Sequence, residues 1–333
     1  MINSIKNMLC LMLIILGLTS HAYSYEGAAS FLKRGMSARA LGLGGAYTAL
    51  VNDPSAVYWN PAGIANGLGF SMQISDLKDA QFYSNISDVN YPQMAMTLSP
   101  RWKLFTTVTM GIGFGFSGYY VNGIEQYDEQ SSYLGDLNYS EMAYYFSYAF
   151  GVDNVQMGIS YKYLQQDFGI VQRESSIAQN LKGADIGIRY SPFRFLILAI
   201  TINDKIEVGR KEYTAKAVTS SLAFNFTQLS IATDYSISDI SFDRIRSGLE
   251  YRIGNEMQYA FRIGVRDIPI RDGNERLADI IELNAKLSLG FGYQYNVGNN
   301  GRAIIFDIGM QQEMKPSLVS PFSRIIATTI TLK

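Results

Sequence analysis

Four arginines are the side chains best placed in this sequence to do chemistry together. They fall in two consecutive segments, at positions of equal parity within each: Arg246, Arg252, Arg262 and Arg266. If both segments are strands, side chains two residues apart point to the same side, so all four would face one interior. A guanidinium presents a rigid fork of N–H donors that matches carboxylates and phosphates. Two hypotheses follow. The arginines could form a contact site for an anion in that interior, or a network of ion pairs with acidic residues on the same face.

The rest of the composition argues against catalysis. His21 and Cys10 are the single histidine and the single cysteine, and both precede residue 25. From residue 25 onward the chain therefore cannot form a disulfide, a Cys/His zinc site or a Ser-His-Asp triad. With 28 basic and 29 acidic side chains, it also lacks the basic excess that nucleic-acid binding requires. We expect a protein that is not an enzyme, with no cofactor, no metal and no nucleic-acid partner.

The first 24 residues have the features of an export signal. Lys6 precedes an apolar run over residues 8–18, and Ala22 and Ser24 place small side chains three residues and one residue before Tyr25. This pattern predicts Sec-type export with cleavage near Ser24/Tyr25. The apolar run is about half the ~20 residues that a membrane-spanning helix needs.

The elements that would hold the arginines are long strands. In 283–296, for example, apolar side chains at odd positions alternate with polar residues and glycines at even positions. Strands of a soluble sandwich are about 5–6 residues long, whereas these segments reach 10 or more. Tyr and Phe occur at the ends of the apolar faces, as in the aromatic girdles of membrane barrels. The apolar face would therefore contact lipid.

The same alternation recurs fourteen times. The predicted strands lie near 68–76, 91–98, 103–117, 139–150, 155–165, 183–190, 193–202, 216–226, 228–236, 242–253, 256–266, 281–296, 301–311 and 322–332. Connections after even-numbered strands are short, and those after odd-numbered strands are mostly long. The longest, 118–138, would be a docking or ligand-entry surface, or an ordinary solvated extracellular loop. The pattern predicts an all-β fold, a 14-stranded antiparallel transmembrane β-barrel in the outer membrane, with membrane lipid around it.

Residues 25–67 interrupt the alternation. They are rich in Gly, Ala and Ser, and contain the pair Asn60-Pro61. Glycine permits close packing and unusual dihedral angles, and a residue before proline is held in an extended or turn conformation. We expect a plug inside the barrel, or more simply a turn leading into the first strand. The expected organisation is a signal peptide over 1–24, an N-terminal hatch segment over 25–67, and the barrel over 68–333.

The stretch 37–65 resembles a known family signature. It reads SARALGLGGAYTALVNDPSAVYWNPAGIA and is similar to the amino-terminal signature of the PorV/PorQ family, which is related to the FadL long-chain fatty-acid transporters. The run KGADIGIRYSPFRFLILAITIND also resembles that family. The resemblance implies a 14-stranded barrel with an internal hatch. It implies a hatch motif made of Arg39, Gly45, Asp53, Asn60, Pro61, Ala62 and Gly63.

Four glycines occur in the third predicted strand, which we expect to present them on its inner face: Gly111, Gly113, Gly115 and Gly118. One hypothesis is that they permit a kink and a lateral opening toward lipid, as the FadL resemblance implies. The other is that small residues make room for the hatch.

Two functions remain open from the sequence. One is a passive channel for hydrophobic small molecules, with an apolar pocket between hatch and wall to which Phe105, Tyr145 and Ile305 contribute. The other is a non-enzymatic component of protein secretion, a shuttle or anchor of the type IX kind. That role predicts a filled lumen and contacts between the long loops and secretion-machinery proteins.

Overall fold

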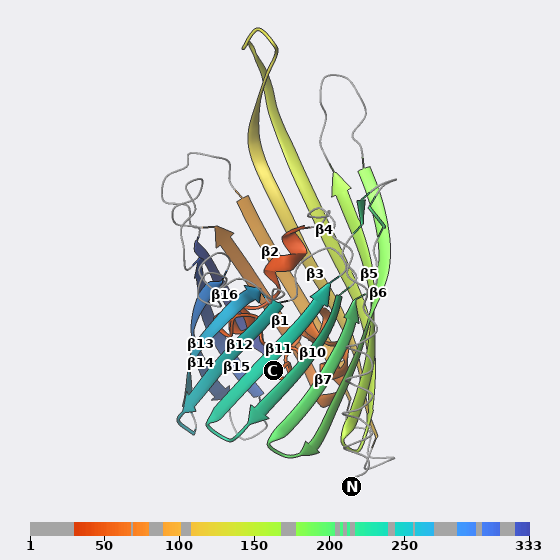
Figure 1. Ribbon diagram of the computed structural model, residues 1–333, viewed down its shortest axis with the longest axis vertical. Helices are drawn as coiled ribbons and strands as arrows, with labels where there is room; N and C mark the ends of the chain where they lie inside the picture. Colours follow the sequence, from red (N-terminus) through yellow and green to blue (C-terminus); the bar gives the residue numbers. More distant parts are fainter. Residues whose placement is uncertain are drawn as a thin grey trace, which may run out of the picture.

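A closed barrel forms almost the whole molecule (Figure 1). The computed structural model describes residues 30–67, 69–79, 89–100, 108–167, 178–203, 207–208, 212–213, 217–238, 244–255, 257–269, 285–297, 302–313 and 324–333. Fourteen antiparallel strands follow one another around the barrel, and β1 closes it by pairing with both β2 and β16. The predicted fold class is confirmed. The predicted signal peptide and its cleavage point lie outside the described residues.

The helices and strands have the following bounds. Four short helical turns come first: η1 (Ser30–Arg34), α2 (Ala38–Gly42), α3 (Ala56–Trp59) and η2 (Pro61–Asn66). The barrel strands are β1 (Gly69–Asp79), β2 (Val89–Ser99), β3 (Val108–Tyr127), β4 (Tyr133–Val152), β5 (Val155–Asp167), β6 (Ala178–Phe193), β7 (Leu196–Asn203), β10 (Ala217–Asn225), β11 (Leu229–Ser238), β12 (Arg244–Ile253), β13 (Met257–Pro269), β14 (Lys286–Val297), β15 (Arg302–Glu313) and β16 (Arg324–Leu332). Between β7 and β10, β8 (Glu207–Val208) pairs with β9 (Glu212–Tyr213). Among the described residues, no helix is both long and apolar enough to cross a bilayer.

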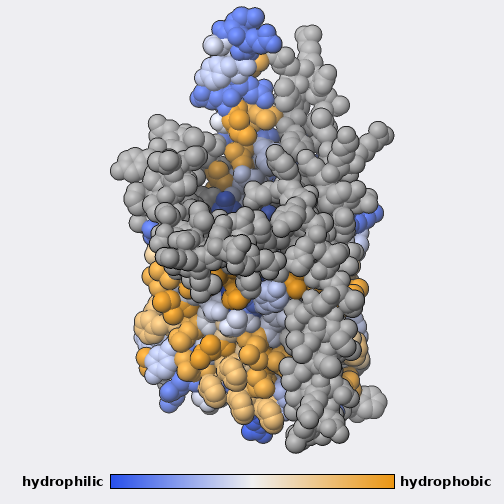
Figure 2. All heavy atoms as spheres, in the orientation of Figure 1, coloured by the Kyte–Doolittle hydropathy of each residue, from blue (hydrophilic) through white to orange (hydrophobic). Residues whose placement is uncertain are grey.

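The outer surface of the barrel is apolar. Side chains of one parity along each strand point outward, and large hydrophobic ones stay exposed, among them Phe146 at 60% and Phe261 at 50%. Side chains of the other parity are buried inside, such as Ser147 and Ser160. On the face that Figure 2 shows, hydrophobic residues gather over the lower part of the barrel. An apolar patch of this extent is the surface that a bilayer covers.

One predicted loop is instead a hairpin. β3 and β4 continue beyond the barrel and pair as far as Tyr127 and Tyr133, so the expectation of a loop over 118–138 was wrong. Asp128 closes the turn by accepting hydrogen bonds from the backbone N–H groups of Gln130 and Ser132. Both faces of this projection contact solvent, so its sequence lacks the alternation by which the other strands were recognised.

Residues 31–66, which we call the inner segment, fill the lumen. Leu43, Ala46 and Tyr47 are fully buried, as is most of the rest of the segment. α2 packs against β13–β16, whereas η2 packs against β2–β6 on the opposite wall. Polar side chains of the wall bind its backbone; for example, Asp234 accepts hydrogen bonds from the N–H groups of Tyr47 and Thr48 at 3.2 and 3.1 Å. The inner segment is thus attached to the barrel on all sides.

Candidate functional site

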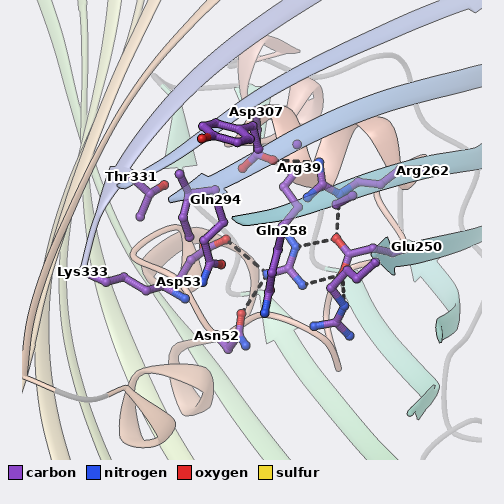
Figure 3. Close-up of a pocket in the computed structure, with 15 residues that line it drawn as sticks. Arg39, Asn52, Asp53, Glu250, Gln258, Arg262, Gln294, Asp307, Thr331 and Lys333 are labelled. Carbon is purple, nitrogen blue, oxygen red and sulfur yellow. Dashed lines mark hydrogen bonds and ion pairs between the residues drawn. The ribbon is translucent and has the colours of Figure 1, made fainter. Parts of the chain in front are cut away.

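The centre of the site is a buried carboxylate, Glu250 on β12. Arg39 of α2 donates to both of its oxygens, Nε to Oε2 at 2.9 Å and Nη2 to Oε1 at 3.0 Å. Arg262 on β13 donates from Nε to Oε2 at 2.6 Å, and its Nη1 donates to Asp307 Oδ1 at 2.7 Å. Arg252 Nε lies 3.5 Å from Glu250 Oε1. A buried carboxylate is tolerated only when it is paired and hydrogen-bonded in this way. This series of ion pairs, Arg39–Glu250–Arg262–Asp307, joins the inner segment to three wall strands (Figure 3).

On its other side, Arg39 organises the inner segment itself. Its Nη1 donates to Asn52 Oδ1 at 2.8 Å and to the Tyr47 hydroxyl at 2.9 Å. That hydroxyl donates to Asp53 Oδ2 at 2.5 Å, and Asp53 Oδ1 accepts from the backbone N–H of Ser55 at 3.0 Å just before α3. Burial, together with the neighbouring Asp53 carboxylate, holds the pKa of Tyr47 well above its usual value, although the Arg39 guanidinium opposes this. The hydroxyl is therefore a protonated donor at neutral pH.

A small polar cavity adjoins this network at the end of the barrel that carries the short turns. Its volume is about 90 Å³, less than the about 150 Å³ of an apolar cavity that takes up benzene. The lining residues are Arg39, Asn52, Asp53, Glu250, Arg252, Gln258, Ala260, Arg262, Gly292, Tyr293, Gln294, Ile305, Asp307, Thr331 and Lys333. Figure 3 shows their charged and amide groups converging on one space. A cavity of this size and polarity suits a few waters rather than a hydrocarbon.

The other two predicted arginines lie in a separate cluster nearer the long-loop end. Arg246 Nε is 3.7 Å from Asp267 Oδ1, and Arg266 Nε is 3.4 Å from Asp267 Oδ2. Arg244, which was not among the predicted residues, lies 3.6 Å from the same carboxylate. Arg266 also donates to backbone carbonyls at the start of the inner segment, those of Lys33 and Arg34. The structure thus places the four arginines in two pairs, not in a single group.

The Asn60-Pro61-Ala62 motif lies deep in the lumen. Asn60 Oδ1 accepts from the N–H of Ala62 at 3.1 Å and so caps η2, while Nδ2 donates to the Thr48 carbonyl at 3.1 Å. Pro61 occupies the first turn of η2, where a missing N–H is tolerated. On the wall, a Cβ at Gly158 would come within 2.5 Å of the Pro61 backbone. The motif therefore fastens two parts of the inner segment to each other and packs backbone against backbone on β5.

The two remaining motif glycines support the same packing. Gly45 follows α2 with φ at +76°, a left-handed conformation that a glycine adopts without strain. A Cβ at Gly63 would come within 2.7 Å of the Val51 carbonyl oxygen. Both positions require the absence of a side chain.

The glycine row of β3 faces the inner segment at three of its four positions. A Cβ at Gly111 would lie 2.6 Å from Ile64, and one at Gly113 or Gly115 would lie 2.6 Å from Val57. These contacts correspond to the hypothesis that the glycines make room for the segment. Gly118 was wrongly expected on this face. It pairs with Met142 and points outward, where a Cβ would meet Phe116 and Tyr120, because the odd-numbered residues of β3 are the inward ones.

The apolar pocket expected between segment and wall is not formed by the residues that were named for it. Ile305 lines the polar cavity, and Phe105 lies outside the described residues. Tyr145 is 1% exposed and packs edge-on against Tyr58, with ring centroids 6.0 Å apart.

Sequence reasoning missed two members of the site, Tyr47 and Asn52. Both belong to the stretch on which the family resemblance rests, but their type and spacing gave no separate signal. They are found only because the inner segment folds back on Arg39.

Comparison with known proteins identifies the fold. No family model and no curated sequence matches the chain. Among solved structures, the Pseudomonas putida toluene transporter TodX aligns with a TM-score of 0.62 at 12% identity, over 94% of this chain and 99% of that one. The Ralstonia pickettii toluene transporter TbuX gives 0.57 at 14% identity, over 90% and 98%. A Pseudomonas aeruginosa FadL homologue gives 0.52 at 11% identity, over 89% and 97%. The chain therefore has the fold of the FadL-like outer-membrane barrels.

Proposed function

We propose that this chain is an outer-membrane protein and a passive channel for hydrophobic small molecules. The observation that carries the proposal is the agreement of 94% and 90% of the chain with two structures described as toluene transporters. The exposed apolar band supports a membrane location. Transport by diffusion needs no catalytic group, which agrees with a chain that lacks His and Cys from residue 25 onward.

In this proposal the inner segment is a hatch. Residues 31–66 are mostly buried against the wall, so in this proposal a hydrocarbon passes when the segment shifts relative to the wall. The ion pairs of Arg39 hold one half of the hatch, and the Asn60 motif holds the other. On β3, three glycines receive the side chains of Ile64 and Val57, so no wall side chain at those three positions has to move when the segment shifts.

A disulfide that locks the hatch tests the proposal. Val57 and Gly113 suit this purpose because they are in direct contact: a Cβ at 113 would lie 2.6 Å from a Val57 methyl, the place that the sulfur of a cysteine at position 57 would take. Cys10, the one other cysteine, belongs to the predicted signal peptide. Uptake of radiolabelled toluene and of a labelled fatty acid is measured in cells that express V57C/G113C, before and after reduction.

We expect uptake to be low when the pair is oxidised and to recover with reductant, whereas V57C alone stays unaffected. Uptake that equals that of cells without the protein in every state would refute the channel.

A second candidate is a non-enzymatic component of protein secretion, as the PorV/PorQ resemblance implies. The observation in its favour is that residues 31–66 occupy the lumen and are mostly buried against the wall. This role predicts that detergent extracts yield secretion or surface proteins bound to the chain. It also predicts that the oxidised V57C/G113C variant supports secretion as well as the reduced one.

A further inference from the structure

One buried carboxylate on the inner face of the barrel has no basic partner among the described residues, and it belongs to Glu141 on β4. The residue is 4% exposed. Its Oε1 accepts hydrogen bonds from the Tyr139 hydroxyl at 2.5 Å and from the side-chain amide of Gln166. Its Oε2 accepts none from a described residue, yet it is not among the buried oxygens that lack a partner, so it reaches open space. Half of this carboxylate is therefore available to a donor from outside the chain.

The other buried carboxylates among the described residues all have strong donors. Burying a charge without such partners is costly. Asp234 accepts hydrogen bonds from two backbone N–H groups and from a serine hydroxyl. The remaining four form ion pairs with Lys or Arg at 2.6 to 3.4 Å: Asp185, Glu250, Asp267 and Asp307. Glu141 is the exception, and a role in holding the barrel together does not explain it.

Aromatic rings lie next to this carboxylate on the same face. Tyr119 on β3 is the register partner of Glu141, and Tyr139 packs edge-on against Tyr119 with centroids 5.9 Å apart. Tyr91 and Phe31 stack on Tyr119, with centroid distances of 4.8 and 6.2 Å. Tyr119 and Tyr139 are half-buried, so part of each ring stays accessible. The carboxylate and an apolar aromatic surface are thus presented together.

The same wall already binds one cation of the chain itself. The Arg34 guanidinium lies over the Tyr91 ring, 4.5 Å from its centroid. Tyrosine faces attract guanidinium and ammonium groups, and a carboxylate forms short, strong hydrogen bonds with N–H and O–H donors. A ligand that suits both features has an aromatic body to pack on Tyr119 and a donor that reaches Glu141. Toluene has no such donor, and the Glu141 charge would repel an anion.

We propose that Glu141, Tyr119 and Tyr139 form a recognition site for small aromatic molecules that carry a hydrogen-bond donor, either an ammonium group or a phenolic hydroxyl. The donor binds Glu141 Oε2 while the ring packs against the tyrosines. The site lies toward the long-loop end of β4, because the short turn follows Val152 at the other end. The inference rests on the proposed channel, and it narrows the substrate class from hydrophobic molecules in general to aromatic ones with a polar head.

Equilibrium dialysis tests the site on the whole protein in phosphatidylcholine nanodiscs, with the signal of empty nanodiscs subtracted. The labelled probes share one ring: benzylamine, a cation at neutral pH, p-cresol with its hydroxyl, and toluene with no donor. We expect benzylamine or p-cresol to bind the native chain about tenfold or more tightly than E141Q, the contribution of one hydrogen bond to a charged group. Toluene binding should change less than twofold. The probe that responds to E141Q identifies the donor.

Three further variants complete the test, each first shown to fold by its heat-dependent gel shift. E125Q is the matched control, because Glu125 also lies on the β3–β4 pair and accepts a tyrosine hydroxyl, but on the hairpin beyond the barrel. It should bind every probe as the native chain does. E141D keeps the charge and should retain the preference for the donor-bearing probe. Y119L keeps Glu141 and should weaken benzylamine binding through loss of aromatic surface.

Equal binding of benzylamine and p-cresol by the native chain and E141Q would overturn the proposal. An equal loss for toluene, or an equal loss in E125Q, would do the same. Uptake by cells keeps this result apart from the channel. If toluene enters cells but E141Q binds every probe as the native chain does, the recognition site is wrong and the channel stands. If no probe enters cells but binding depends on Glu141, the channel is wrong and the site stands.

Discussion

Replacing Arg39 with Gln should loosen the inner segment while leaving the barrel closed. The substitution removes two charge-assisted hydrogen bonds to Glu250, at 2.9 and 3.0 Å, from a site where the Arg39 and Glu250 side chains are only 13% and 1% exposed. Breaking a buried pair costs about 3–5 kcal/mol, and we take the lower end because Glu250 keeps Arg262. At 1.4 kcal/mol per factor of ten, transient release of the segment should become about a hundredfold more frequent.

Hydrogen–deuterium exchange measures this release directly. Peptides covering residues 38–66 should exchange about a hundredfold faster in R39Q, whereas peptides of β4 and β5 should be unchanged. The matched control is K78Q, which breaks the exposed pair of Lys78 and Asp76, 3.8 Å apart and 66% and 46% exposed. Such a surface pair contributes at most about 1 kcal/mol.

A double-mutant cycle with E250Q separates the pair from its surroundings. Because both substitutions remove the same contact, the loss of protection at residues 38–66 in R39Q/E250Q, expressed as a free energy, should be much smaller than the sum of the losses in R39Q and E250Q. If R39Q and K78Q change the exchange of residues 38–66 equally, the Arg39–Glu250 pair does not hold the segment and our reasoning is wrong.

Three further substitutions test the remaining contacts of the inner segment. Gly158→Ala places a Cβ about 2.5 Å from the Pro61 backbone, and this overpacking should destabilise the folded barrel by about 1–3 kcal/mol. The barrel should therefore unfold at a lower temperature in gel-shift assays. Gly118→Ala, on the outer face, is the control and should not change that temperature. Asn60→Ala removes the cap of η2 and leaves the Thr48 carbonyl unpaired. The free energy that opens residues 60–66 should fall by about 1–3 kcal/mol, and their amides should exchange faster. Unchanged exchange would contradict the capping role. The pKa of Tyr47 is raised on folding, so its contribution is complete below the usual tyrosine value of about 10 and is lost as pH rises toward the higher folded value. Tyr47→Phe should therefore remove part of the loss of stability measured above pH 10, and an identical pH profile would show that Tyr47 does not titrate with unfolding.

The barrel could be predicted from sequence because its determinants are local. An alternation such as that of 283–296 assigns each side chain to lipid or lumen without reference to the rest of the chain, since successive strand residues point to opposite faces. The prediction was wrong where the two faces of a strand do not differ in their surroundings, or where a residue has no side chain to distinguish them. Residues 122–138 have solvent on both faces, and Gly118 has no side chain to report its direction.

The site depends on pairs that are distant in the sequence. Arg39 and Glu250 are 211 residues apart, and neither residue by itself indicates that the other is its partner. Likewise, the separation of the four predicted arginines into pairs around Glu250 and around Asp267 follows from strand register and from the depth at which each side chain enters the lumen. The sequence alone determined a closed barrel with a polar interior and a small-residue segment to occupy it. Only the tertiary structure decided which charges meet, because the energy of a buried ion pair depends on distances of a few ångströms that no local pattern encodes.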